Sequence, residues 1–295
     1  MIIYMFPGQG SQVPGMGKEL FDLFPEHCER ASQQLGYDLK ALCLSDKAQQ
    51  LNDTAFTQPA LYVICSLSFL KENNNPDLVV GHSLGLYPAL FAAKAFSFEQ
   101  GLTLVAQRAT LMAKVNNGSM MAVLGEKVDL LDDLLLQNGY YDIDIANYNS
   151  PTQLVLSGKQ DRLNEFKPIL EQLGYRVLPL TVSGAFHSRY MKQAATAFSD
   201  FLGNQIFRPL ETKVISTTHG GLITENHLLE ELTYQLVKPV RWRQTIDYLL
   251  KPIQHTQLID AVERFLKKQE LQQSSQLLNL KENLNGKKKF AYSSS

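Results

Sequence analysis

One five-residue segment, Gly-His-Ser-Leu-Gly at positions 81–85, limits the possible folds of this 295-residue chain more than any other. It follows the apolar run Leu78 to Val80 and precedes residues 87–94, which are rich in Ala and Leu. This order predicts a buried strand, a tight turn and a buried helix. Glycine on each side of Ser83 permits a turn that is too tight for Cβ atoms and that strains the serine backbone. We therefore expect the Ser83 hydroxyl to be exposed at the end of the strand, where backbone N–H groups and the helix N-terminus also point.

Ser83 needs a base, because a serine hydroxyl is hardly nucleophilic at neutral pH. Of the six histidines, His187 stands at the end of a predicted strand, after small and apolar residues at 183–186 that would let its imidazole reach across a cleft. His82 lies inside the turn and is expected to point away from Ser83. The residues alone make His187 the first candidate for the base and leave a purely structural role for it open.

Apolar periodicity predicts alternating strands and helices, and thus an α/β protein. The predicted strands are 1–6, 77–80, 120–124, 143–146, 154–156, 176–182, 213–217 and 255–259, and the predicted helices are 16–35, 39–51, 59–70, 87–94, 98–115, 127–138, 160–173, 188–203, 226–236 and 241–250. Within residues 118–182 the order βαββαβ is that of an inserted ferredoxin-like unit. We expect residues 1–117 and 183–266 to form the larger, catalytic domain, and residues 267–295 to form a mobile polar tail.

The composition is that of an ordinary soluble enzyme. Hydrophobic residues make up 44% and charged residues 19%, and the formal net charge is −1. This balance argues against nucleic acid or an anionic membrane as a partner, and no apolar stretch is long enough to span a bilayer. The three cysteines have scattered spacing that fits neither a disulfide framework nor a metal site, so we expect a reducing cytoplasm and no bound metal.

Six motifs in order resemble the malonyl-CoA:acyl carrier protein transacylases, and most closely the free-standing acyltransferases that serve modular polyketide synthases in trans. The resemblance covers about residues 1–266, and the motifs lie at 6–12, 81–85, 107–112, 147–151, 184–188 and 239–242. It implies an α/β-hydrolase-like large domain with an inserted ferredoxin-like small subdomain.

The resemblance also implies the roles of individual residues. Ser83 would be the nucleophile and His187 its base, with the imidazole oriented by backbone carbonyls and not by a carboxylate. The backbone N–H groups of Gln9 and Leu84 would form the oxyanion hole. Arg108 would hold the free carboxylate of a malonyl group, since a guanidinium can clamp a carboxylate with two charge-assisted hydrogen bonds.

Four further positions are expected at the substrate. Phe186 would keep the pocket small, and Asn147 and Asn149 would line the cleft between the domains unless they merely cap a turn. Arg241 occupies a position often filled by glutamine, whose backbone carbonyl orients the base, and this backbone role would survive the exchange to arginine.

The implied reaction moves a malonyl group from coenzyme A, through an ester on the serine, to the phosphopantetheine thiol of an acyl carrier protein, for polyketide or fatty acid synthesis. Malonyl-CoA and the carrier protein would be the partners, coenzyme A would enter only as the thioester substrate, and no cofactor would be bound permanently. We expect a monomer.

Departures from the family pattern keep alternatives open. Leu86 replaces a usual glutamate after the turn, and the loop after Asp260 lacks glycine and proline. Some relatives instead hydrolyse stalled acyl groups from carrier proteins, so an editing hydrolase is the main alternative. A non-malonyl acyltransferase, a silent docking subunit, and a triad built on the late His255 are the others.

Overall fold

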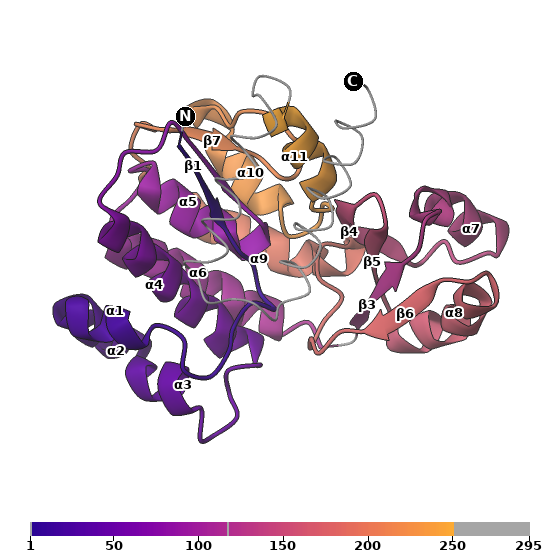
Figure 1. Cartoon of the computed structure of the whole chain (residues 1–295), viewed down its shortest axis with the longest axis horizontal. Helices are drawn as coiled ribbons and strands as arrows, with labels where there is room; N and C mark the ends of the chain where they lie inside the picture. The colour runs from indigo at the N-terminus through magenta and orange to yellow at the C-terminus, as the bar shows by residue number, and fades with distance from the viewer. Residues whose placement is uncertain (1, 117, 251–295) are drawn as a thin grey trace, which may run out of the picture.

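The computed structural model describes residues 2–116 and 118–250, which form a larger α/β unit and a smaller unit beside it (Figure 1). The larger unit contains a parallel sheet in the order β1-β2-β7, with β1 at Ile3–Phe6, β2 at Leu78–Gly81 and β7 at Lys213–Ile215. Its helices are α1 (Lys18–Leu23), α2 (Pro25–Leu35), α3 (Leu39–Ser45), α4 (Thr54–Glu72), α5 (Leu86–Ala92), α6 (Phe98–Ala113), α9 (Lys192–Leu202), α10 (Leu228–Tyr234) and α11 (Trp242–Leu250). Three short 3₁₀ helices, η1 (Ser83–Gly85), η3 (Arg189–Met191) and η4 (Glu225–His227), precede α5, α9 and α10.

The parallel sheet is buried on both faces, and its side chains alternate between two cores. Met5, Val80 and Ile215 face a core that also contains Trp242 and Ile246 of α11. Their neighbours along the strands, such as Phe6, Val79 and Val214, belong to the main core with α4, α5, α6 and α9. This double burial explains why the strands read as continuous apolar runs.

The smaller unit has the element order βαββαβ that the sequence predicts. Its antiparallel sheet has the order β4-β5-β3-β6, with β3 at Ser119–Leu124, β4 at Asp144–Ser150, β5 at Gln153–Gly158 and β6 at Arg176–Pro179. The 3₁₀ helix η2 (Val128–Leu130) leads into α7 (Leu131–Gln137), and α8 (Gln160–Gln172) connects β5 to β6.

The small sheet is packed against both its own helices and the larger unit. Val123, Ile145 and Leu156 form a core with residues of α7 and α8. Residues of the opposite parity, such as Met120, Ala122, Ala146 and Val155, belong instead to the main core of the larger unit. In addition, the N–H of Val240 donates to Ala146 O at 2.8 Å, and the N–H of Tyr148 donates to Val240 O at 2.9 Å. The two units therefore share a core and a backbone pairing.

Several predicted boundaries were wrong for local reasons. The helix predicted to begin at Pro59 begins at Thr54, because the Asp53 side chain accepts a hydrogen bond from Ala55 N and caps the helix there. The helix predicted over 16–35 is interrupted at Phe24, and Pro25 starts the second helix. The predicted strand 255–259 and the tail 267–295 lie outside the described residues.

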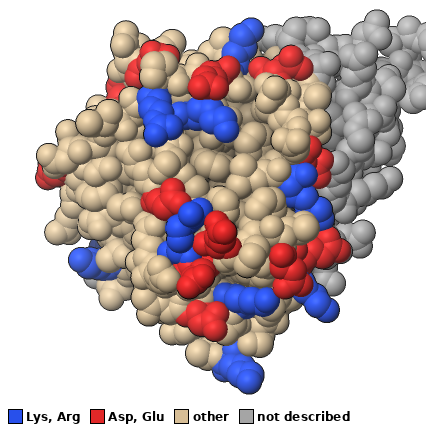
Figure 2. All heavy atoms as spheres, turned by 90° about the vertical axis from the view of Figure 1, so that its left-hand side faces the viewer, with Lys and Arg blue, Asp and Glu red and all other residues tan. Residues whose placement is uncertain are grey.

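The surface over α1 to α4 carries charges of both signs. Figure 2 shows this side of the molecule, with Lys and Arg interspersed among Asp and Glu. Ion pairs such as Lys71–Glu19, Lys40–Asp22 and Arg30–Glu99 join neighbouring helices. The described part of this face has no large patch of one sign.

Within residues 2–116 and 118–250 no helix is both long and apolar enough to cross a membrane.

Candidate active site

Ser83 lies at the tight turn between β2 and α5, where the backbone is strained. Its φ is 52°, in the left-handed region that non-glycine residues avoid. A Cβ on Gly81 would lie 1.9 Å from the backbone carbon of Gly85, and a Cβ on Gly85 would lie 2.2 Å from Phe6 O. The prediction that both positions exclude side chains is confirmed.

The imidazole of His187 lies next to the Ser83 hydroxyl. Ser83 Oγ is 2.7 Å from His187 Nε2, and His187 Nδ1 is 2.7 Å from the backbone carbonyl oxygen of Gln235. Because a carbonyl only accepts, Nδ1 must carry the proton, and Nε2 offers its lone pair to the serine hydroxyl. The partner of the imidazole is thus a backbone carbonyl and not a carboxylate.

The surroundings keep His187 neutral. Burial, and secondarily the nearby Arg108 cation, lower the pKa of His187 to about 3, against the opposing effect of the hydrogen bond that His187 donates to the Gln235 carbonyl. An imidazole with this pKa is unprotonated throughout the physiological range and can accept a proton from Ser83.

Arg108, on α6, places a buried cation beside the serine. Its side chain is only 1% exposed. Nη2 lies 3.3 Å from Ser83 Oγ and donates to Gln235 Oε1 at 3.1 Å, while Nη1 donates to Gln58 Oε1 at 2.6 Å. Nε has no hydrogen-bond partner in the described part of the chain. The guanidinium therefore has donor capacity left, and within residues 2–116 and 118–250 no carboxylate forms an ion pair with it.

Two glutamines complete this site, and neither is among the residues predicted from the sequence. Gln58, on α4, interrupts an apolar stretch, which is a weak signal for a buried polar role. Gln235 follows α10 and contacts all three groups: its carbonyl accepts from His187, its Oε1 from Arg108, and its Nε2 donates to Ser83 O at 2.9 Å. Nothing in the local pattern around Gln235 indicates this position.

The loop after β1 packs directly on the serine turn. A Cβ on Gly8 would lie 2.5 Å from His82 O, and the N–H of His82 donates to Phe6 O at 2.9 Å. Gln9, predicted to supply an oxyanion N–H together with Leu84, follows this contact, and its side chain donates to Thr54 Oγ1 at 3.0 Å. The close backbone approach brings the two segments together at the serine turn.

His82 points away from Ser83, toward the smaller unit. Its Nε2 is 3.2 Å from Asn149 Oδ1 and 3.5 Å from Asn147 Nδ2, and its ring lies 5.3 Å from that of Trp242. Burial lowers the pKa of His82 to about 4. Asn147 and Asn149, both buried, thus lie at the contact between the two units and bind the residue that precedes the serine.

One predicted contact was wrong. The carbonyl that orients His187 belongs to Gln235 and not to Arg241, because the Arg241 carbonyl accepts at the start of α11 from both the N–H and the hydroxyl of Thr245, at 3.0 and 2.9 Å. The Arg241 guanidinium lies over the Tyr148 ring, 5.4 Å from its centroid.

The other predicted neighbours of the site are buried. Phe186, next to the base, is 5% exposed and packs in the main core, and Leu86 is buried completely in the same core. The effect of Leu86 is therefore on packing behind the serine turn.

The side chains of several other cysteines and histidines of the described residues lie in environments without a serine partner, and His219 lies 3.9 Å from Glu231. Burial raises the pKa of Cys65 and of Cys43 to about 12, so both remain thiols. His27 packs between Phe24 and Phe98, and His227 contacts Thr224. His255 lies outside the described residues. Within the described ranges no cluster of His, Cys, Asp and Glu could hold a metal ion.

Over most of its length the chain is similar to proteins of one family. The acyl transferase domain family matches residues 3–293. The polyketide biosynthesis malonyl CoA-acyl carrier protein transacylase PksC of Bacillus subtilis is 47% identical over 257 residues, covering 85% of this chain and 89% of that protein. A solved malonyl CoA-acyl carrier protein transacylase from Burkholderia pseudomallei is 39% identical with a TM-score of 0.82 over 90% of each chain.

A further solved structure contains a partner. It is a type II PKS acyl-carrier protein in complex with its malonyl-transacylase. The matching chain of that structure is 31% identical to this chain, with a TM-score of 0.80 over 85% of each chain. The resemblance that six short motifs indicate is thereby confirmed over most of the sequence, and the chain belongs to the acyl transferase domain family, among the malonyl-CoA:acyl carrier protein transacylases.

Proposed function

We propose that this chain moves a malonyl group from coenzyme A, through an ester on Ser83, to the phosphopantetheine thiol of an acyl carrier protein, in polyketide synthesis or alternatively in fatty acid synthesis. The names of the similar proteins support the substrate, the carrier and the polyketide context. The observation that carries the proposal is the convergence of a neutral imidazole and a buried guanidinium on one serine oxygen, at 2.7 and 3.3 Å.

In the first half-reaction His187 Nε2 takes the Ser83 proton while Oγ attacks the thioester carbonyl. The tetrahedral oxyanion would accept hydrogen bonds from the N–H groups of Gln9 and Leu84. The C–S bond then breaks, and the proton on His187 passes to the departing sulfur, so coenzyme A leaves as the thiol. In the second half-reaction the carrier's thiol gives its proton to His187, attacks the ester and releases Ser83, which regains the proton.

Arg108 supplies the selectivity for a malonyl group in this proposal. In the described part of the chain its Nε has no hydrogen-bond partner and no carboxylate pairs with it, so the site suits a substrate carboxylate, which would bring both an anion and strong acceptors. An acetyl group would leave the buried cation unpaired.

We also propose that the larger unit, residues 1–117 and 183–266, is α/β-hydrolase-like and that residues 118–182 are a ferredoxin-like subdomain. The element order and strand order of the smaller unit support the second assignment. We propose a cytoplasmic monomer that binds no permanent cofactor.

The test follows the masses of carrier proteins. The protein is incubated with malonyl-CoA and unloaded holo-carrier, and separately with acetyl-loaded carrier. We expect gain of malonyl on the unloaded carrier and slow loss of acetyl from the loaded one. Rapid loss of acetyl to water without malonyl gain would identify an editing hydrolase instead.

A further inference from the structure

The first residue of β4 holds the segment that follows His187. Both oxygens of the Asp144 carboxylate lie 3.0 Å from Arg189 Nε, and Arg189 Nη2 also donates to Oδ1. The same carboxylate accepts the backbone N–H of Arg189 at 2.9 Å. One side chain of the smaller unit therefore fixes both the backbone and the guanidinium of a residue two positions after His187.

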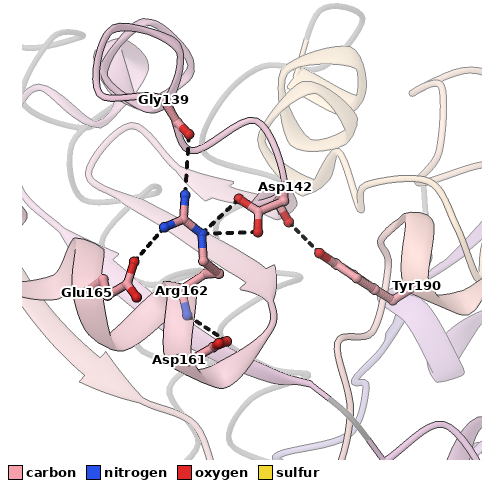
Figure 3. Close-up of polar contacts among 6 residues, drawn as sticks. All are labelled: Gly139, Asp142, Asp161, Arg162, Glu165 and Tyr190. Atoms are coloured by element: carbon pink, nitrogen blue, oxygen red, sulfur yellow. Dashed lines mark hydrogen bonds and ion pairs between the residues drawn. The ribbon is translucent and has the colours of Figure 1, made fainter.

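The next residue is tied to the same place. Tyr190 Oη donates to the carbonyl oxygen of Asp142 at 2.9 Å, as Figure 3 shows. The Asp142 carboxylate is itself bound by Arg162, which also contacts Glu165 and the carbonyl of Gly139. The anchoring loop before β4 is thus braced within its own unit.

The residues before His187 are restricted by packing. A Cβ on Gly184 would lie 2.5 Å from Val115 O, and a Cβ on Gly118 would lie 2.5 Å from that of Ala185. His187 itself has a φ of 55°, an unfavourable left-handed conformation for a residue with a side chain. Such a conformation persists only where the surroundings hold it from both sides.

We propose that Asp144 is a positioning residue for the base: by fixing Arg189, it holds His187 in its strained conformation with Nε2 on the Ser83 hydroxyl. This inference rests on the proposed role of His187 as the base and adds a carboxylate of the smaller unit to the determinants of its geometry.

The effect is expected on rate and not on folding. The Arg189 side chain is 56% exposed and the Asp144 side chain 22%, so solvent screens the guanidinium and the pair should contribute little to global stability. A small displacement of a base, in contrast, reduces the rate of the step that it assists by large factors.

A matched control exists at another contact between the units. Arg243 of α11 donates to both carboxylate oxygens of Asp129 in η2, at 2.8 and 3.0 Å. This pair also joins the two units through a guanidinium and a carboxylate, but neither residue adjoins Ser83 or His187 in sequence or contacts either of them.

The experiment compares Asp144→Ala, Asp144→Asn and Asp129→Ala in the full chain. The rate of Ser83 labelling by a fluorophosphonate measures how well the base activates the serine, without a malonyl substrate. Steady-state kinetics with malonyl-CoA separate kcat from KM. For Asp144→Ala we expect labelling and kcat to fall about 10-fold with KM nearly unchanged. Asn keeps a neutral acceptor for the Arg189 N–H and should restore part of the rate, and Asp129→Ala should stay within about 2-fold of the unaltered protein.

Equal rates for Asp144→Ala and the unaltered protein, or an equal fall in Asp129→Ala, would overturn the proposal. Melting temperatures should differ by no more than about 2 °C. If Asp144→Ala does not fold, Arg189→Gln gives the same comparison, with an expected fall of about 3-fold against none if the contact is inert. A protein that labels at Ser83 with this dependence but transfers no malonyl group would contradict the proposed function and leave this inference standing.

Discussion

Ser83 and His187 are 104 positions apart in the sequence, lie 2.7 Å apart, and both have left-handed backbone conformations, with φ of 52° and 55°. The conformation costs about 1–2 kcal/mol per residue when a side chain is present. The glycines of the turn permit it on one side, and packing with the contacts of the smaller unit maintains it on the other. Both partners are therefore arranged before substrate binds, at the expense of local stability.

The backbone strain at Ser83 predicts how two variants at this position should differ in stability. Ser83→Ala and Ser83→Gly should both abolish covalent labelling by malonyl-CoA, because the hydroxyl is lost. Ser83→Gly should be the more stable of the two by about 1 kcal/mol, since glycine tolerates a positive φ. Urea unfolding of both variants checks the order of stability, and labelling at another residue in either variant would refute the nucleophile assignment.

The pKa of His187 predicts an unusual pH dependence. In the unaltered protein the rate of fluorophosphonate labelling should stay level from pH 8 down to about 5, because the pKa of His187 is lowered to about 3 and the imidazole remains neutral. Arg108→Met removes a cation that lowers this pKa, so the acid fall-off should move to higher pH. A half-maximal rate near pH 6.5 in the unaltered protein would contradict the buried, uncharged base.

The sequence predicts much of this site because its chemistry lies in short local patterns. The run from Leu78 through Gly85 fixes a strand, a turn and a serine position with steric logic that the structure confirms. The period-two and helical patterns also give the element order of the smaller unit and, apart from the break at Phe24, that of the described part of the larger unit. These features depend on neighbours a few residues away.

What could not be predicted depends on contacts between distant segments. Gln235 is an ordinary polar residue near the end of an amphipathic helix, and only the packing of α10 against the turn brings it to Ser83, His187 and Arg108. The carbonyl assigned to Arg241 was wrong for the same reason, since any of several carbonyls in that region could face the imidazole. Burial of Leu86 likewise requires knowledge of the main core.

Arg108 should determine the choice between acyl groups. Arg108→Ala should reduce the single-turnover rate of acylation by malonyl-CoA by about 100-fold, and reduce that by acetyl-CoA far less, because only malonyl brings a carboxylate. Quenched-flow measurements with both thioesters test this. Equal losses for the two substrates would remove Arg108 from the selectivity role.

Gln58 offers a test that leaves Arg108 in place. Its Oε1 accepts from Arg108 Nη1 at 2.6 Å, so Gln58→Glu would put an anion against the guanidinium with almost no change in shape. The new carboxylate should neutralise the cation and repel the malonyl carboxylate, which lowers acylation by malonyl-CoA by about 100-fold and leaves acylation by acetyl-CoA nearly unchanged. Gln58→Leu, which adds no charge, is the control and should be less selective in its effect.

His82 should make stability depend on pH. Burial lowers its pKa from 6.5 to about 4, so the unfolded chain binds more protons than the folded one between these values. The contribution of the neutral His82 imidazole to the free energy of unfolding is therefore complete above pH 6.5 and is lost as the pH falls toward 4. For this residue alone, the free energy of unfolding should drop by about 2 kcal/mol from pH 7 to pH 5.

His82→Gln removes the titrating group and can still donate to Asn149, so its free energy of unfolding should fall less over that range than that of the unaltered protein. Urea unfolding of both at the two pH values gives the difference directly, because all other titrating groups are common to the pair. Equal pH dependence would show that the imidazole of His82 is not held neutral between the serine turn and the smaller unit.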